Sequence, residues 1–190
     1  AAILQPPFFD PEADPALNYG GIGAVIGHEM LHGYDDQGSQ FDAEGNNNNW
    51  WTEADLKNFQ ARTGKLVAQF DDYVAIDNLH VKGQLTLGEN IADLGGLTVA
   101  YDALQRDLMN KRMALVDGYT QDQRFFMNWA TVWRRNFRPE ELKVRLNTDP
   151  HAPAGFRAIG APSNMASFAS AFQCKPGDAM VRGDKSILIW

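Results

Sequence analysis

Apolar residues recur along much of the chain at spacings of three and four, which is the period of a helix with one buried face. Prolines and turn-forming residues predict an extended lead-in over residues 5–16. A first, mostly buried helix is predicted to follow, with apolar residues at Ile22, Val25, Ile26, Met30 and Leu31. Its glycines allow close packing at some cost in helix propensity.

The same period predicts further helices downstream. Thr52 and Asp55 form a capping pair ahead of a second helix. The apolar positions of the second, third and fourth helices are, in turn, Leu56, Phe59, Leu66 and Phe70; Leu87, Ile91, Leu94, Tyr101, Leu104 and Leu108; and Phe125, Phe126, Trp129, Val132, Trp133 and Phe137. The third helix opens near Thr86, and the fourth spans roughly residues 120–137.

The remaining segments complete a mainly α fold, with α+β character where small β elements form. Short helices are predicted after Pro139 and from Ser163 to Phe172, residues 35–50 are a loop, and residues 74–85 are extended. The final "KSILIW" is either a strand or a docked tail. We find no internal repeat or linker, so residues 1–190 are expected to form a single domain.

Composition narrows the function classes. The 190 residues are 44% hydrophobic, enough for a sizeable core, and no apolar run reaches the length of a membrane span. The formal charge of −7 argues against a nucleic acid or an anionic membrane surface as partner. A small or peptide-like ligand in water fits better.

Cysteine usage leaves the compartment open. Cys174 is the single cysteine, so no intrachain disulfide can form. The sequence also has no Asn-x-Ser/Thr acceptor, which favours a bacterial or cytosolic origin. The expected locations are the bacterial periplasm or exterior and the cytoplasm, with export favoured.

The stretch "GHEMLHGYDD" carries the clearest chemistry. His28 and His32 are four residues apart, so on a helix they share a face, with side-chain origins about 5–6 Å apart, and can bind one metal ion. Glu29 points about 100° away, where it can take a proton from water beside the ion. This is the HExxH pattern of zinc peptidases. The alternative is two helix histidines with ordinary hydrogen bonds, which would be costly in so apolar a helix.

A catalytic zinc ion usually has three protein ligands, so a third must come from elsewhere. The segment "TLGENIADLGG" offers Glu89 and Asp93, four apart on the third helix. One can bind the metal while the other orients a histidine ring through its free N–H. Thr86 and Glu89 also fit a capping box, which alone would be the better explanation of Glu89. Beside a two-histidine helix that lacks a ligand, metal binding by Glu89 becomes the better explanation.

Two acids follow His32 at spacings of three and four. Asp35 or Asp36 can hold the His32 ring as Asp93 can hold that of His28. An ordinary role as loop acids after a helix end explains Asp35 and Asp36 equally well.

The order of several segments resembles the catalytic part of the neprilysin family of zinc metallopeptidases. The segments are "ILQPPFF", "NYGGIGAVIGHEMLHGYDDQG", "WWT", "LGENIADLGGL", "RPEELKVRLNTDPHAPAGFR" and the terminal Trp190. The resemblance implies a zincin (thermolysin-like) catalytic subdomain and a zinc-dependent endopeptidase with one Zn²⁺ ion. It also implies small peptides as substrates, with an apolar residue preferred just after the scissile bond.

The resemblance assigns roles to individual residues. It implies that His28, His32 and Glu89 hold the zinc ion and that Glu29 activates the water. Asp93 matches an aspartate often described as a proton donor.

Further positions match residues that support the site or contact substrate. Asp35 would support His32, His151 would stabilise the oxyanion of the tetrahedral intermediate, and Arg157 would bind a substrate carbonyl. The pocket for the apolar side chain would be lined by Ile3, Phe8, Val25 and Trp133. From the residues alone, a histidine between two prolines and a loop arginine would be expected at the surface.

Two departures from the family pattern bear on function. The family has an Asn-Ala segment and an N-terminal helical lobe upstream, so we expect a fragment of a longer chain whose missing lobe is its partner. In vertebrate members, the cysteine that matches Cys174 forms a disulfide with a cysteine near the C-terminus. This sequence has Ile187 at that second position, which indicates a bacterial member. The rival functions are a non-catalytic module held together by zinc, an inactive fragment and, more distantly, another metal hydrolase such as an amidase.

Overall fold

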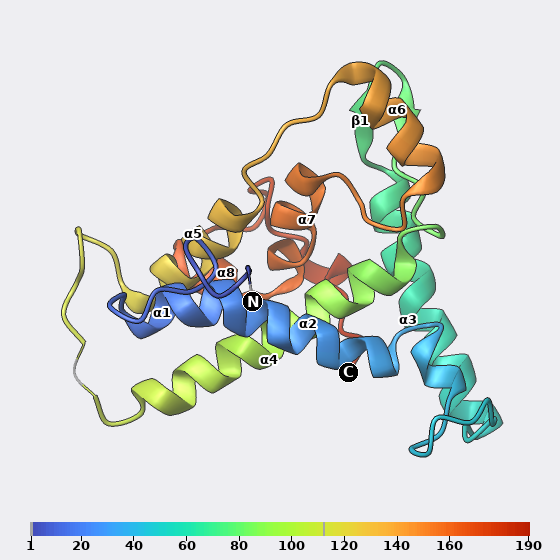
Figure 1. Ribbon diagram of the computed structural model, residues 1–190, viewed down its shortest axis with the longest axis horizontal. Coiled ribbons are helices and arrows are strands. Elements are labelled where there is room, and N and C mark those ends of the chain that lie inside the picture. The colour runs from blue at the N-terminus through green and yellow to red at the C-terminus, as the bar shows by residue number, and fades with distance from the viewer. Residues whose placement is uncertain (1, 112) are drawn as a thin grey trace.

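The computed structural model describes residues 2–111 and 113–190, and most of its elements are helices (Figure 1). The α-helices are α1 (Pro15–Asn18), α2 (Ala24–Leu31), α3 (Glu53–Asp71), α4 (Leu87–Leu108), α5 (Gln121–Val132), α6 (Pro139–Thr148), α7 (Ala154–Gly160) and α8 (Ala166–Ala171). Strands β1 (Val74–Ile76) and β2 (Leu79–His80) pair antiparallel in a small hairpin. The mainly α prediction with small β elements is therefore confirmed.

Shorter helical turns join these elements. A π-helical turn, Tyr19–Gly23, runs from α1 directly into α2. Turns of 3₁₀ helix cover His32–Tyr34, Gly38–Gln40, Pro162–Asn164 and Gly183–Lys185. Among the described residues, no helix combines the length and the apolar character needed to cross a membrane.

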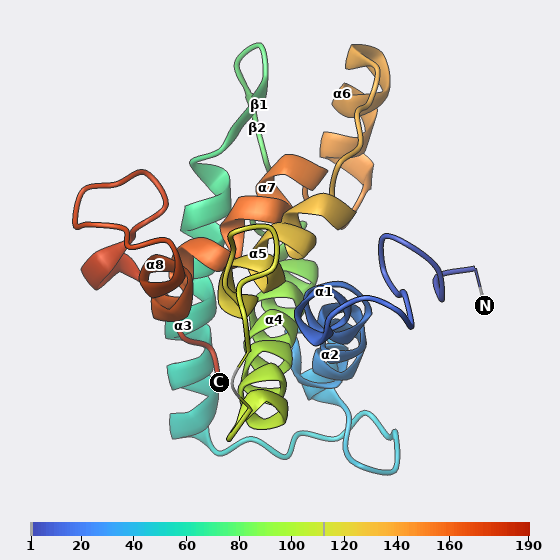
Figure 2. The same cartoon turned by 90° about the vertical axis from the view of Figure 1, so that its left-hand side faces the viewer.

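Helix α4 is the centre of the fold. Figure 2 shows it between α3 on one side and α2 on the other, with α5 and α7 packed close by. Ile91, Leu97 and Leu104 of α4 are fully buried. They join a core that includes Trp129 and Phe125 of α5. The helical spacing of apolar residues therefore places one helix at the middle of the core.

Helices α2 and α4 touch through glycines. A Cβ atom on Gly27 would lie 2.6 Å from the carbonyl oxygen of Gly96, and one on Gly96 would lie 2.3 Å from the backbone nitrogen of His28. Both distances are too short for carbon in a side chain, so only glycine permits this approach. The contact brings His28 on α2 beside the first half of α4.

We expect Gly96→Ala to lower the free energy of unfolding by roughly 3 kcal/mol, because the added methyl group would force the two backbones apart. Gly64→Ala is a matched control on α3, where an added Cβ meets no atom of the described part of the chain within 4 Å. It should be neutral or stabilising by about 0.5–1 kcal/mol. Urea unfolding of the two variants measures both values; equal stabilities would contradict the close approach.

Three predicted boundaries are wrong. Helix α5 ends at Val132 rather than near residue 137, because Trp133 leaves helical geometry and Arg138, which precedes a proline, is extended. The helix predicted from Ser163 to Phe172 is broken by extended Met165, so α8 begins at Ala166. Helix α7 was not predicted at all. The extended segment 74–85 forms strands only at 74–76 and 79–80.

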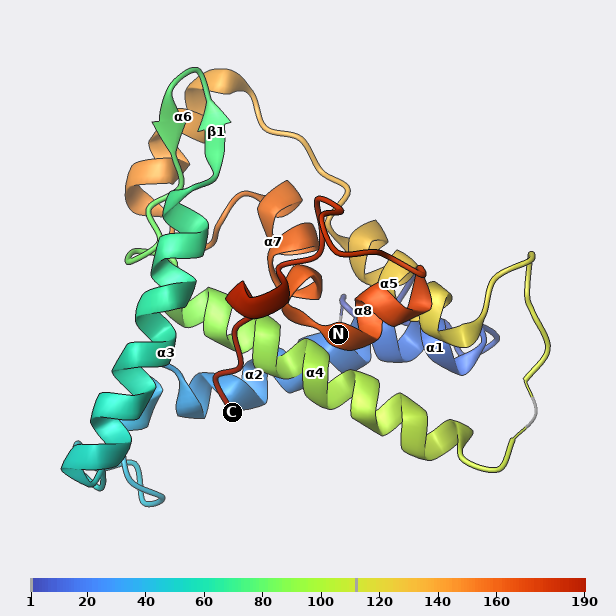
Figure 3. The same ribbon diagram turned by 180° about the vertical axis from the view of Figure 1, so that it is seen from behind.

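The C-terminal segment is a docked tail and not a strand. The N–H of Ile187 donates to Asn164 Oδ1 at 3.0 Å, and Arg62 Nη1 donates to the carbonyl oxygen of Ile189 at 2.9 Å. The ring of Trp190 lies 5.3 Å from that of Phe59, centre to centre. Figure 3 shows the tail crossing from α8 toward α3 and α4. The two buried isoleucines supply the apolar contact that fixes it.

Candidate metal centre and active site

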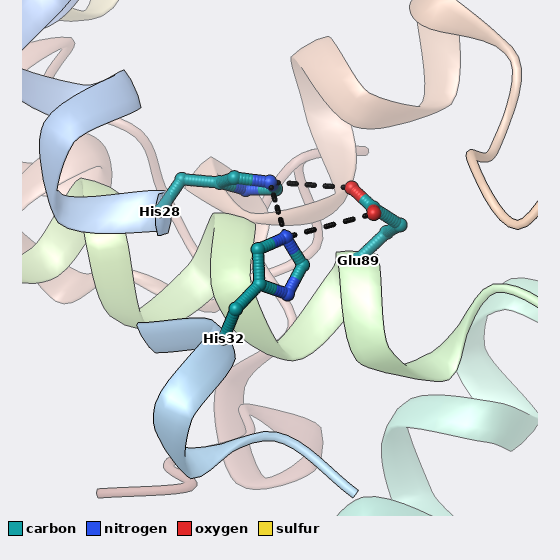
Figure 4. A group of neighbouring side chains, drawn as sticks. All are labelled: His28, His32 and Glu89. Atoms are coloured by element: carbon teal, nitrogen blue, oxygen red, sulfur yellow. Dashed lines mark hydrogen bonds and ion pairs between the residues drawn. The ribbon is translucent and has the colours of Figure 1, made fainter. Parts of the chain in front are cut away.

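Three side chains from two helical segments converge on one point (Figure 4). His28 lies near the end of α2, His32 begins the 3₁₀ turn that follows, and Glu89 is in the first turn of α4. The two Nε2 atoms lie 3.0 Å apart. Glu89 Oε2 lies 3.2 Å from His28 Nε2, and its Oε1 lies 3.6 Å from His32 Nε2. The convergence predicted from the HExxH pattern and the downstream glutamate is present.

These donor atoms fit a zinc ion. Ligands at about 2.0–2.1 Å from a tetrahedral ion lie roughly 3.3 Å from one another, close to the spacings found here. Two imidazole nitrogens that face each other repel unless a proton or a cation lies between them. Two neutral imidazoles and one carboxylate are also the ligands that catalytic zinc sites use, and they leave the fourth position open.

Each histidine ring is held from its far side by an aspartate. His28 Nδ1 lies 2.8 Å from Asp93 Oδ1, and His32 Nδ1 lies 2.8 Å from Asp35 Oδ2. Asp35 is itself fixed, because its Oδ1 accepts backbone N–H bonds from Gln37 and Gly38. With Nδ1 carrying the proton toward each carboxylate, both Nε2 atoms are free to bind a metal. The sequence left Asp35 and Asp36 as alternatives for this position, and the structure places Asp35 there.

Asp93 connects the histidine to a buried guanidinium. Arg157 Nε and Nη2 donate to the two oxygens of Asp93, each at 2.7 Å, and both residues are buried. Burial has the largest single effect on the pKa of Asp93 and raises it, but the charges and hydrogen bonds of Arg157 and His28 together outweigh burial, so the pKa is lowered. Burial has the opposite effect on the histidine and lowers the pKa of His28. Hydrogen bonds to Asp93 and Glu89 nevertheless raise that pKa to about 9 in the absence of a metal. Metal binding therefore competes with a proton at His28.

Glu89 does not cap α4. The N-cap residue Thr86 makes no side-chain bond to the helix N-terminus. Its hydroxyl instead donates to the carbonyl oxygen of Lys82 and accepts from Asn90 Nδ2. The capping-box alternative for Glu89 is thus wrong, and its carboxylate faces the two histidines.

Beside this cluster lies a cavity of roughly 470 Å³. It is lined by Ile3, Phe8, Val25, His28, Glu29, Asp93, Trp129, Trp133, Arg135, Arg145, Asp149, His151 and Arg157. All four residues that the family resemblance places in an apolar pocket are among them. Glu29 is exposed to this cavity and makes no hydrogen bond or ion pair within the described part of the chain. Its carboxylate is therefore accessible to a ligand that enters.

His151 reaches the same cluster from the segment between α6 and α7. Its Nε2 lies 3.3 Å from Glu89 Oε2, and its Nδ1 lies 2.7 Å from Asp149 Oδ1. Asp149 Oδ1 also accepts a hydrogen bond from the backbone N–H of His151 at 2.9 Å, so Asp149 holds both the backbone and the ring of His151. The sequence interpretation missed Asp149. The signal was an aspartate two residues before a histidine, the spacing of a local side-chain turn.

From the residues alone, Arg157 was expected in a loop at the surface, and this expectation is wrong. It lies on α7 and is 5% exposed, with its guanidinium 4.1 Å from the centre of the Trp133 ring. Its third contact is a longer one, 3.4 Å from Nη2 to Glu89 Oε2. One buried cation thus contacts both carboxylates of α4 that face the site.

The chain matches the family model described as Peptidase family M13 over residues 1–187. Among curated relatives, Neprilysin-11 of Caenorhabditis elegans is 44% identical, with 100% of this chain and 23% of the relative covered. Human Neprilysin is 42% identical, with 100% and 26% covered. The chain thus spans about a quarter of the length of these relatives.

Solved structures agree with this match. Zinc metalloprotease Zmp1 of Mycobacterium tuberculosis, in complex with an inhibitor, superposes with a TM-score of 0.96 at 46% identity, over 100% of this chain and 30% of that one. PepO of Lactobacillus rhamnosis HN001 gives 0.87 at 37% identity, over 99% and 28%. On the family match, the shared fold and a donor set that fits zinc, the chain belongs to peptidase family M13.

Proposed function

We propose that this chain is the catalytic part of a zinc-dependent endopeptidase that hydrolyses small peptides. The observation that carries the proposal is the convergence of His28, His32 and Glu89, whose ligand atoms all lie within 4.8 Å of one another. These three residues would hold one zinc ion. When bound, zinc supplies Lewis acidity and lowers the pKa of a water molecule that it binds.

Glu29 performs the proton transfers. Its carboxylate is accessible from the cavity and follows His28 directly in the chain, so it lies beside the metal position without being one of the three convergent ligands. It takes a proton from the attacking water and passes that proton to the leaving amine. A group with no partner in the described residues is free to do both. Asp93, which holds His28 and Arg157, keeps the adjacent groups in place.

His151 and Arg157 contact the peptide. His151 donates an N–H to the oxyanion of the tetrahedral intermediate, and Asp149 fixes the ring for that purpose through Nδ1. Arg157 holds a substrate carbonyl oxygen while its other N–H groups stay on Asp93.

The apolar wall of the cavity favours a leaving-side residue such as Phe or Leu. Ile3, Phe8, Val25 and Trp133 line this wall beside Glu29. An apolar side chain placed there is removed from water at about 25 cal/mol per Å². We further propose that an N-terminal lobe of the same protein closes over the cavity, which fits the greater length of the relatives.

An internally quenched peptide with Phe or Leu after the scissile bond tests the function. The full-length protein should cleave it, and a zinc chelator such as 1,10-phenanthroline should reduce the rate at least about a hundredfold, because the proposed chemistry needs the metal. Added zinc should restore the rate. Zinc bound without cleavage would instead favour the non-catalytic zinc-held module, and cleavage that resists the chelator would contradict the metal mechanism.

A further inference from the structure

Arg135 lines the same cavity as Glu29 and His151, on the connection between α5 and α6. Its guanidinium carbon lies 5.4 Å from the centre of the Trp133 ring and 5.8 Å from that of Phe137. Contacts with two aromatic rings restrain an otherwise exposed side chain and keep its cation at the cavity. Its edge N–H groups, which bind carboxylates in pairs, remain available.

The other two guanidinium groups of the cavity are already paired. Arg157 binds Asp93 at 2.7 Å, and Arg145 binds Asp149 at 2.6 Å as well as Glu141 at 2.9 Å. Arg135 has no ion pair and no side-chain hydrogen bond over residues 2–111 and 113–190, although Glu29 lines the same cavity. Among the described residues, Arg135 is therefore the arginine of this cavity whose charge has no direct carboxylate partner.

The surroundings of Arg135 carry positive charge. Partial burial lowers its pKa first, and the charges of Arg157 and Arg145 lower it further, against an opposing effect of Asp149. A guanidinium remains charged at all ordinary pH values, so the repulsion between these arginines persists. An anion beside Arg135 would relieve it.

We propose that Arg135 gives this peptidase a preference for substrates that place a carboxylate at the leaving-side end of the cavity. The inference rests on the proposed function, which puts the leaving-side residue against Trp133, the ring on which Arg135 stacks. A carboxylate in a peptide has two sources, namely an acidic side chain and the free C-terminus. Both present the same planar pair of oxygens to the guanidinium.

Matched peptide pairs separate the two sources. One pair carries Glu or Gln two residues after the scissile bond, a second carries Glu or Gln directly after it, and both have amidated ends. A third pair ends two residues after the bond with a free or an amidated C-terminus. The zinc-loaded full-length protein should favour the carboxylate member of at least one pair about two- to fivefold in kcat/KM, the range that an exposed charge pair supplies.

Arg135→Ala should bring that ratio to about one, and Arg135→Lys should retain part of it because the charge stays while the planar fork is lost. Arg134→Ala is the matched control, since this exposed neighbour does not line the cavity and should keep the full ratio. An equal ratio in the Arg135→Ala and unchanged proteins overturns the inference while leaving the peptidase assignment intact. Absence of metal-dependent cleavage of every peptide, neutral ones included, would reject both.

Discussion

Replacing Glu29 with Gln should lower kcat for peptide hydrolysis by roughly 10²–10⁴-fold while zinc stays bound, because general base catalysis contributes about that factor. Glutamine matches the size of glutamate but cannot accept the proton of water at neutral pH. The three convergent side chains do not include Glu29, so the metal position is unchanged. The loss should appear in kcat, since the proton moves only as the reaction proceeds.

Single-turnover kinetics with a quenched peptide, together with zinc by elemental analysis, measures both halves of this expectation. Glu44→Gln is a suitable control, because Glu44 is an exposed acid in the loop before α3 and does not line the cavity. It should leave kcat and zinc content unchanged. Substantial turnover by the Glu29→Gln protein would remove Glu29 from the role of base and direct attention to another cavity group such as His151.

The parts of the fold that local patterns determine were predictable. The periodic apolar positions of α3 and α4 specify both helices, and Thr52 caps α3 through the N–H of Asp55 as expected. Residues 133–138 were not predictable in this way. Their aromatic side chains keep a helical spacing, but Trp133 and Phe137 stack with arginines across the turn between α5 and α6. Spacing cannot distinguish aromatic residues in a helix from aromatic residues that hold a turn.

The same distinction between local pattern and tertiary packing applies to the residues of the site. His28 and His32 are close in the sequence, so their spacing of four residues on a helix predicts that both rings can bind the same metal ion. Glu89 lies far along the chain, and its approach depends on a glycine contact between α2 and α4 that no local pattern reveals. The sequence reveals even less that Arg135 has no carboxylate partner within the described residues, because this depends on which carboxylates the neighbouring arginines have already bound. Such properties belong to the packed structure.

Replacing Glu89 with Ala should weaken zinc binding at least about a hundredfold. Even groups that only hydrogen-bond to a ligand usually change metal affinity by roughly 10–100-fold, and Glu89 offers the only carboxylate of the described three-residue cluster. Two imidazoles alone would remain, with one negative charge fewer to offset the cation. Peptidase activity should fall with the zinc content and should recover in part at high zinc concentration.

The Glu89→Ala protein should nonetheless fold, which separates metal binding from a structural role. Thr86 does not cap α4 with its side chain, so no capping box is lost. Glu140→Ala is the control, an acid in the first turn of α6 with no ion pair in the described chain. Zinc titration and thermal unfolding of the metal-free proteins provide the two measurements. Undiminished zinc affinity in the Glu89→Ala protein would show that the carboxylate of Glu89 is not a ligand. If Glu140→Ala binds zinc normally and both metal-free variants unfold at similar temperatures, the loss of zinc affinity belongs to the metal centre itself.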